Sequence, residues 1–280
     1  METNMKKFEG ILICTDLDGT LLRNDKTISE ENKRAIEYFK SEGGKFSFIT
    51  GRMHYFATQM YDAIKPNAPI GCANGGAVYD HSLGRYVWYQ ELPMSALELV
   101  KHVFDHVPDM GVHFTMFDKI YFWGENDEMD LFRERTSSPK LLRDFDKMEE
   151  SKEPMAKIVF CHPDADVAFY SLDLLKKHPR RDEFDFIRSE RTLFEILPKG
   201  VGKGNALLRI ADALGIDRSR TIAIGDYDND ISMIKAAGVG IAVGNALPEV
   251  KEAADLITVT NDEHAIARII ADIESGEIKI

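Results

Sequence analysis

The sequence predicts an α/β fold: a doubly wound, mostly parallel sheet with an inserted α+β domain. In residues 1–83 and 197–280, short apolar runs end in polar or Gly-rich turns and are followed by amphipathic segments. That alternation is typical of βα units in a parallel sheet. Residues 84–196 instead contain neighbouring apolar runs joined by short turns, which is typical of hairpins.

The outer pattern predicts six strands, each short and apolar enough to be covered on both faces. They span 11–15, 45–50, 70–73, 221–225, 240–243 and 256–260. Helices fit between them. We expect the first to be bounded by Thr27 and Glu30 in capping-box spacing and ended by Gly43, and another to span about 204–214 and end at Gly215.

The middle of the chain predicts an α+β unit. Its expected strands are 85–92, 112–117, 119–123, 156–161, 184–188 and 192–196. Helical patterns lie near 95–107 and 164–176, and the mixed charges of 125–153 favour a solvated helix and loop. The expected domains are a first core part, the insert and a second core part, with boundaries 1–83, 84–196 and 197–280.

Composition excludes several classes of protein. The chain has 35 Lys or Arg, 47 Asp or Glu and 44% hydrophobic residues. This composition indicates a globular protein, neither disordered nor fibrous. Its net charge of −12 argues against a nucleic-acid binder. The first apolar run, 11–14, is too short to cross a bilayer, so we expect a cytoplasmic protein with no membrane partner. Cys14, Cys72 and Cys161 lack zinc or disulfide spacing, which favours small buried residues.

The densest chemical pattern is Asp16-Leu17-Asp18-Gly19-Thr20, directly after the first expected strand. Open α/β sheets bind ligands at the carboxyl ends of their strands. Asp16 and Asp18 can leave the strand near one another, and Gly19 lets the backbone turn sharply. One carboxylate could attack while the other transfers a proton. Alone, the same run is equally compatible with an Asp-Gly turn whose carboxylates are solvated.

A second acidic run, Gly225-Asp226-Tyr227-Asp228-Asn229-Asp230, follows the strand 221–225. If Asp16, Asp18 and Asp226 converge, each pair at about 4 Å would repel by roughly 4 kcal/mol at an effective dielectric near 20. A hard divalent cation would relieve that repulsion. Oxygen ligands without His or Cys favour Mg²⁺ over Zn²⁺. Alone, the run could be helix capping, with Asn229 or Asp230 as the N-cap.

Two further turns are candidates for binding an anion. Thr50-Gly51-Arg52 offers a hydroxyl, a backbone N–H and a helix N-terminus, while Arg52 could equally reach the substrate or pair with a core carboxylate. Lys203 lies in Gly200-Val201-Gly202-Lys203-Gly204, which is not a Walker A motif because Gly204 stands where Ser or Thr is required. Lys203 remains a candidate because a buried cluster of acids and phosphate needs a permanent positive charge.

These four pieces resemble the haloacid dehalogenase (HAD) superfamily, specifically its Cof-type phosphatases with a large α/β (C2-type) cap. In the chain they follow one another as Asp16–Thr20, Thr50–Arg52, Gly200–Gly204 and Gly225–Asp230. The resemblance covers nearly the whole chain. Asn74-Gly75-Gly76-Ala77 and Val243-Gly244-Asn245-Ala246 resemble further landmarks of the family. Each motif is weak alone, and the order of all four at expected strand ends makes the resemblance specific.

The resemblance implies a mechanism and a set of roles. Asp16 would attack phosphorus to give an aspartyl-phosphate, and Asp18 would protonate the departing alcohol and later activate water. Mg²⁺ would be held by the Asp16 carboxylate, the Asp18 carbonyl and Asp226, supported by Asp230. The phosphoryl oxygens would be gripped by Thr50, Gly51, Lys203 and Asn229. The resemblance also implies that the insert is a cap over a small phosphorylated metabolite, such as a sugar phosphate, in a monomer or weak homo-oligomer.

Three other functions are weighed against this one. A catalytically silent binding protein would be expected to lose Asp16, Asp18, Lys203 or Asp226, and all four are present. A receiver-like switch needs neither Asp18 nor an inserted domain. The runner-up is a phosphohexomutase-like phosphoryl transferase, which would rearrange a hexose phosphate without accumulating phosphate. Candidates for lining a substrate pocket, each more often a surface or packed residue, are His54, Tyr55, His113, Trp123 and His162.

Overall fold

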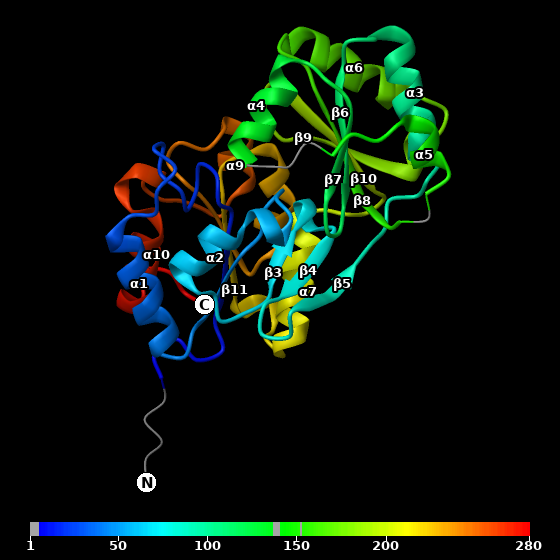
Figure 1. The fold of residues 1–280 in the computed structure, drawn as a ribbon. Helices are drawn as coiled ribbons and strands as arrows, with labels where there is room; N and C mark the ends of the chain where they lie inside the picture. Colours follow the sequence, from blue (N-terminus) through cyan, green and yellow to red (C-terminus); the bar gives the residue numbers. More distant parts are fainter. Residues whose placement is uncertain (1–5, 137–140, 152) are drawn as a thin grey trace. The chain divides into compact units, whose positions relative to one another are not determined.

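The computed structural model describes residues 6–136, 141–151 and 153–280 of the chain, which form two compact units (Figure 1). The first unit comprises Met1–Trp88 and Gly202–Ile280. The second unit comprises Tyr89–Val201, so it is inserted between the two parts of the first.

The first unit is built on a five-stranded parallel sheet. Its strands are β1 (Leu12–Thr15), β2 (Lys45–Phe48), β11 (Thr221–Gly225), β12 (Val239–Ala242) and β13 (Leu256–Ile257), in the order β13-β12-β11-β1-β2. β1 therefore pairs with β2 on one side and β11 on the other, all in parallel. The predicted α/β fold class is confirmed, and the junction between β1 and β11 joins the two parts of the chain.

Helices lie on both faces of this sheet. They are α1 (Glu30–Ser41), α2 (Thr58–Ile64), α7 (Lys203–Leu214), α8 (Ile231–Ala236), α9 (Pro248–Ala253) and α10 (Ala265–Ser275). One buried cluster joins Leu12 and Cys14 of β1 to Ile210 of α7 and Met233 of α8. Blue α1 and red α10, from opposite ends of the sequence, lie side by side in Figure 1. Two apolar faces are therefore covered, as the doubly wound prediction requires.

Two local predictions for this unit are wrong. Helix α1 begins after Ser29, whose hydroxyl accepts from the backbone N–H of Asn32 at 3.2 Å, whereas Thr27 hydrogen-bonds Asp25 instead of Glu30. Ser29 is the N-cap because it directly precedes Glu30, the first helical residue. Strand 256–260 was expected to be covered on both faces. Only 256–257 forms a strand, at the sheet edge and exposed.

A three-stranded sheet extends the first unit. It consists of β3 (Ile70–Cys72), β4 (Ala77–Asp80) and β5 (Arg85–Tyr89), in that order. The strand expected over 70–73 in the parallel sheet makes only a single parallel bridge, Ile49 to Gly71, and otherwise pairs antiparallel with β4. The strand expected over 85–92 in the insert is wrong in its assignment, because β5 belongs to this sheet and ends at residue 89.

The second unit is an α+β layer built on an antiparallel sheet. Its strands are β6 (Gly111–Met116), β7 (Ile120–Gly124), β8 (Met155–Cys161), β9 (Phe184–Arg188) and β10 (Leu193–Pro198), in the order β7-β6-β8-β10-β9. Its helices are α3 (Ala96–His106), α4 (Asp127–Thr136), α5 (Phe145–Glu149) and α6 (Ala165–Lys177). One sheet face packs Phe114 and Phe160 against Val103 and Leu172. Of the charged stretch 125–153, positions 137–140 and 152 lie outside the described residues.

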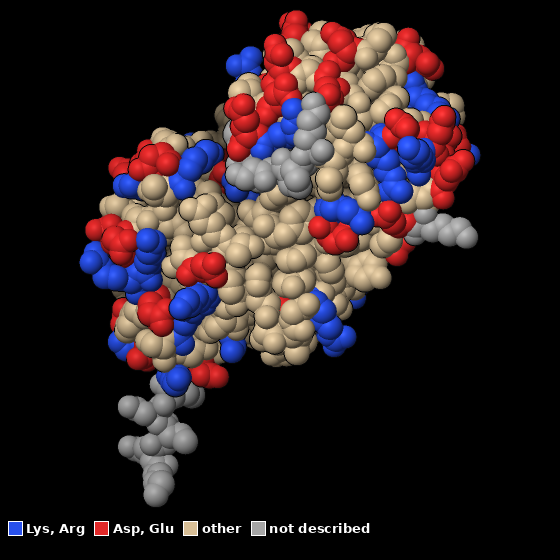
Figure 2. Space-filling model, viewed as in Figure 1, with Lys and Arg blue, Asp and Glu red and all other residues tan. Residues whose placement is uncertain are grey.

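Acidic and basic side chains lie interspersed on the face drawn in Figure 2. All three cysteines are buried, as expected. Within the described ranges, the protein contains no helix with the length and apolar character needed to cross a membrane.

Candidate active site

The acidic residues after β1 and β11 come together at one edge of the parallel sheet. Asp16 continues β1, and its backbone N–H donates to the Ile224 carbonyl at 2.9 Å. Asp226 follows β11 directly. Ligand oxygens of Asp16, Asp226 and Asp230 all lie within 4.8 Å of one another. Adjacent parallel strands end at the same edge, so the strand order itself brings these carboxylates together.

Lys203 supplies a buried cation to this acidic group. It is the first residue of α7 and its side chain is only 1% exposed. Its Nζ donates to Asp16 Oδ1 and to Asp230 Oδ1, each at 2.6 Å. Burial alone would lower the pKa of Lys203, but the charges of Asp16 and Asp230 raise it above its usual value. The ammonium group is therefore held in its charged form.

One lysine does not balance the acidic group. Burial raises the pKa of Asp16 well above its usual value, against the opposing effect of Lys203. Burial, together with the charge of Asp230, raises the pKa of Asp226 to about 7. Full ionisation of these carboxyls is therefore unfavourable without further positive charge, and the group offers hard oxygen donors without His or Cys. That donor set fits Mg²⁺.

Asp230 organises the loop between β11 and α8. Its Oδ2 accepts the backbone N–H groups of Asp226 at 2.9 Å and of Tyr227 at 3.1 Å. Although Asp230 stands at the N-cap position of α8, its carboxylate makes no capping bond to that helix. Neither this side chain nor that of Asn229 caps α8, so the N-cap prediction is wrong. The acidic run does cap a helical turn, because the Asp230 carboxylate completes a capping box with Tyr227 at the start of the 3-10 turn Asp228–Asp230. The carboxylate faces the acidic group, where Lys203 is available as a partner.

Asp18 directs its carboxylate to a different set of partners. Arg52 donates to both of its oxygens, with Nη2 2.8 Å from Oδ2 and 3.0 Å from Oδ1. Lys26 Nζ donates to Oδ1 at 3.1 Å. Burial alone would raise the pKa of Asp18, but the charges of Arg52 and Lys26 lower it. Of the two alternatives for Arg52, the structure shows pairing with a carboxylate.

Three of the four residues expected to bind phosphate, Thr50, Gly51 and Asn229, lie beside Asn74. The Thr50 carbonyl accepts from the Asn74 backbone N–H at 3.0 Å. The Asn229 side-chain Nδ2 donates to Asn74 Oδ1, also at 3.0 Å. A Cβ on Gly51 would lie 3.1 Å from that same oxygen. The sequence prediction omitted Asn74 from the site, although its Asn-Gly pair is a signal for left-handed backbone.

Two further contacts fix the loop that carries the first pair of aspartates. The Thr20 hydroxyl donates to Asp226 Oδ1 at 2.6 Å. Asn245 Nδ2 donates to the Gly19 carbonyl at 2.8 Å. Sequence reasoning had assigned neither Thr20 nor Asn245 to the site. The sequence does not predict the role of Thr20, because its partner Asp226 lies more than two hundred positions away along the chain.

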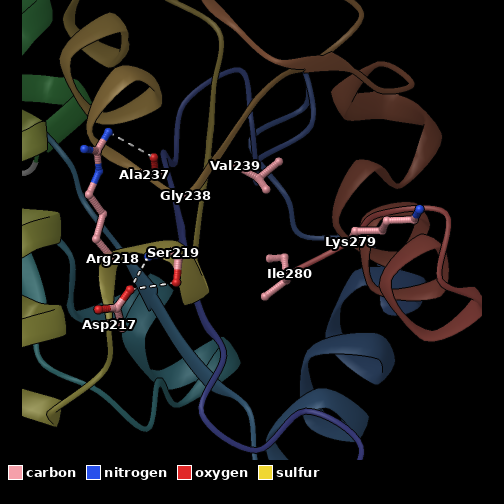
Figure 3. Close-up of a pocket in the computed structure, with 8 residues that line it drawn as sticks. All are labelled: Asp217, Arg218, Ser219, Ala237, Gly238, Val239, Lys279 and Ile280. Atoms are coloured by element: carbon pink, nitrogen blue, oxygen red, sulfur yellow. Dashed lines mark hydrogen bonds between the residues drawn. The ribbon is translucent and has the colours of Figure 1, made fainter.

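An open pocket of about 560 Å³ lies at the opposite edge of the sheet (Figure 3). Its lining includes Arg218 and Ser219, which precede β11, and Gly238, which precedes β12. Arg218 Nε donates to the carbonyl of Ala236 at 2.6 Å, so its guanidinium serves the end of α8. This pocket is therefore separate from the acidic group, which follows the carboxyl ends of the strands.

Two residues named as possible pocket linings are packed against other rings. Trp123 lies against Phe104 and Phe145, with ring centroids 4.0 and 4.6 Å apart. His54 stacks on Tyr79 with centroids 3.9 Å apart. These contacts give both side chains a packing role within their own units.

Comparison with known proteins assigns the chain to a family. The family model described as haloacid dehalogenase-like hydrolase matches residues 13–270. The 5-amino-6-(5-phospho-D-ribitylamino)uracil phosphatase YitU of Bacillus subtilis is 32% identical over 268 residues, covering 93% of this chain and 96% of the relative. The phosphatase YwpJ of the same organism is 28% identical, covering 92% and 98%.

A solved structure agrees with these relatives. A haloacid dehalogenase-like hydrolase from Bacteroides thetaiotaomicron superposes with a TM-score of 0.80 at 28% identity, covering 94% of this chain and 99% of that one. The chain belongs to the haloacid dehalogenase-like hydrolases, in agreement with the resemblance found in the four motifs. Within that family it is a Cof-type phosphatase.

Proposed function

We propose that this phosphatase hydrolyses small phosphorylated metabolites, sugar phosphates or related phosphomonoesters, through an aspartyl-phosphate on Asp16. One observation carries the proposal: the Asp16 carboxylate is buried at the end of β1, 2.6 Å from the Lys203 ammonium, beside two further carboxylates. A nucleophile in such a place is shielded from bulk water, with positive charge available for the incoming phosphoryl oxygens.

The proposed reaction has two halves that share one carboxyl group. An oxygen of Asp16 attacks phosphorus while the bond to the leaving group breaks, and Asp18 gives its proton to the departing alkoxide. Water then attacks the same phosphorus, returns a proton to Asp18 and releases phosphate from Asp16. General acid and base work by one side chain contributes roughly 10²–10⁴-fold to the rate.

The partners of Asp18 bear on the first half. Arg52 and Lys26 favour its carboxylate form, which suits the base needed in the second half. To act as an acid, Asp18 must first take up a proton. We propose that the dianionic phosphoryl group draws Arg52 and Lys26 away from it, because both cations then gain a more highly charged partner.

Mg²⁺ is the proposed cofactor, held by the carboxylates of Asp16 and Asp226 and by the Asp18 carbonyl. When bound, it supplies positive charge that offsets the charge of the carboxylates and the phosphoryl oxygens. Asp230 would support the site without binding the metal, because its two oxygens are already occupied. Oδ1 accepts from Lys203, and Oδ2 accepts from backbone N–H groups.

Four groups are proposed to bind the phosphoryl oxygens. They are the hydroxyl of Thr50, the backbone N–H of Gly51, the ammonium of Lys203 and the side-chain amide of Asn229. The inserted unit Tyr89–Val201 is proposed to act as a cap that contacts the leaving group and excludes water during the first half of the reaction.

Phosphate release from a panel of phosphorylated metabolites tests the activity. The panel includes hexose phosphates and 5-amino-6-(5-phospho-D-ribitylamino)uracil, the compound in the name of the relative YitU. We expect phosphate to accumulate. Conversion of one hexose phosphate into another without phosphate release would instead establish a phosphohexomutase-like transferase.

Two variants and a metal test separate the proposed roles. Asp16→Asn should abolish turnover because an amide is a poor nucleophile, while Asp18→Asn should slow it by about 10²–10⁴-fold. A beryllium fluoride adduct found on a side chain other than Asp16 would refute the assignment. EDTA should abolish turnover and Mg²⁺ should restore it, and calorimetry should detect Mg²⁺ binding to the wild type but only weakly to Asp226→Asn.

A further inference from the structure

The turn Ala73–Gly75, between β3 and β4, has an unusual backbone. Ala73 has φ 51°, Asn74 has φ 54° and Gly75 has φ 95°. Left-handed backbone is disfavoured for residues with a Cβ, above all for two in succession. Such a conformation persists only where surrounding contacts enforce it, and it is often found at functional sites.

The contacts that hold this turn come from the segment Thr50-Gly51-Arg52. The Ala73 N–H donates to the Arg52 carbonyl at 3.1 Å, and the Asn74 N–H donates to the Thr50 carbonyl at 3.0 Å. The left-handed backbone aims both N–H groups at the segment Thr50–Arg52. The Asn74 side chain then lies against Gly51, where any Cβ would be 3.1 Å from its Oδ1 and 3.2 Å from its Nδ2.

The same turn contacts the loop after β11 and the start of α7. Asn74 Oδ1 accepts from Asn229 Nδ2 at 3.0 Å, which leaves the second N–H of that amide to face another acceptor. Gly75 packs against the start of α7: a Cβ there would overlap the Gly202 carbonyl and lie 2.8 Å from the Lys203 backbone nitrogen. Only glycine permits this approach.

We propose that the Ala73–Gly75 turn sets the relative positions of the four phosphate-binding groups, and that Asn74 is the positioning residue at its centre. The inference rests on the proposed function of Thr50, Gly51, Lys203 and Asn229. Those groups come from three separate segments, and the turn contacts all three. Asn74 is fully buried, and it orients Asn229 by hydrogen bonding. Supporting contacts of this kind decide whether a site is correctly organised.

Replacement of Asn74 by glycine removes the side chain while favouring the backbone conformation. With p-nitrophenyl phosphate as substrate and Mg²⁺ present, Asn74→Gly should lower kcat on the order of 10–100-fold, the scale of a phosphoryl group misplaced by about 1 Å. Orthovanadate should inhibit the variant less strongly, and its melting temperature should stay close to that of the wild type. The matched control is Lys65→Gly, at an exposed residue with φ 43° that ends α2, and its kcat should not change.

A double-mutant cycle with Asn229→Ala identifies the route of the effect. If Asn74 acts through Asn229, Asn74→Gly should lower kcat clearly less in the Asn229→Ala background than in the wild type. Equal losses in the two backgrounds would overturn the positioning role, as would an unchanged kcat in Asn74→Gly alone. A wild type inactive towards every phosphate ester would overturn the proposed function, and the inference with it.

A second measurement covers the case in which Asn74→Gly does not fold. A crystal structure of the wild type with Mg²⁺ and orthovanadate should show Asn229 bonded both to vanadate and to Asn74. An Asn229 that binds vanadate only after leaving Asn74 would overturn the inference.

Discussion

Replacement of Lys203 by methionine should unbalance the acidic site and destabilise the first unit. The Lys203 ammonium lies 2.6 Å from both Asp16 and Asp230 and is almost completely buried. Methionine has a similar length and no charge. Breaking a buried ion pair by removing one partner costs about 3–5 kcal/mol, because a buried charge is left uncompensated.

The geometry gives a consistent magnitude. Carboxylate oxygens of Asp16, Asp226 and Asp230 lie within 4.8 Å of one another. At that distance and an effective dielectric near 20, each ionised pair repels by about 3 kcal/mol or more. At pH 8, above the pKa of about 7 to which Asp226 is raised, its carboxyl is mostly ionised, so this repulsion is present. We therefore expect Lys203→Met to lose about 3–5 kcal/mol of stability in EDTA at pH 8.

Urea unfolding in EDTA and in Mg²⁺ measures the effect. Trp88 belongs to the first unit and Trp123 to the second, so fluorescence in a Trp123→Phe background follows the first unit alone. A Mg²⁺ concentration of 100 times the Kd of Lys203→Met should restore about 2.7 kcal/mol to that variant. The same concentration should stabilise the wild type less, because Lys203 already compensates the carboxylates and Mg²⁺ then binds more weakly. Turnover should fall by at least 10²-fold, since a preorganised charge is lost.

The control is a second buried ion pair, in the other unit. Lys157 Nζ lies 2.8 Å from Glu195 Oε2, with side chains 8% and 4% exposed. Lys157→Met, followed through Trp123 in a Trp88→Phe background, should lose a similar free energy and gain nothing from Mg²⁺. Wild-type stability and turnover in Lys203→Met, or equal responses of both variants to Mg²⁺, would refute this reasoning.

Two further predictions concern a glycine and a histidine. Gly19 has φ 82°, and a Cβ there would overlap Asp226 Oδ2. Gly19→Ala should therefore lower the free energy of unfolding by about 1–3 kcal/mol and remove most of the Mg²⁺-dependent turnover. Unchanged turnover would contradict the close approach. Burial, aided by the charge of His81, lowers the pKa of His54 to about 4. Unfolded His54 binds its proton near pH 6.5, so its contribution to stability is lost as pH falls from 6.5 towards 4. Between pH 7.5 and 5 the wild type should lose about 1 kcal/mol more than His54→Gln in urea unfolding, the figure allowing for partial exposure, and equal losses would refute it.

Local sequence patterns determined the fold class and the places where the site could form. A buried apolar run followed by Asp16, and another followed by Asp226, are sufficient to predict strand ends that face the same edge of a parallel sheet. The strand order confirms that β1 and β11 are neighbours. Both Thr27 and Ser29 are residue types that cap helices, and they lie two positions apart, so the sequence alone does not decide which of them is the N-cap.

Tertiary structure alone decided which charged and polar groups meet. The sequence does not show that Arg52 donates to Asp18, or that Thr20 donates to Asp226. Strand pairing brings these partners together, and their spacing along the chain does not reveal it. Likewise, only the structure shows that the left-handed turn at Asn74 contacts Gly51, Gly202 and Asn229. The periodicity of apolar residues and the residue preferences of turns involve only a few neighbouring positions, so they can be recognised directly in a sequence. The contacts that orient an active site join distant segments, and they exist only once the sheet has assembled.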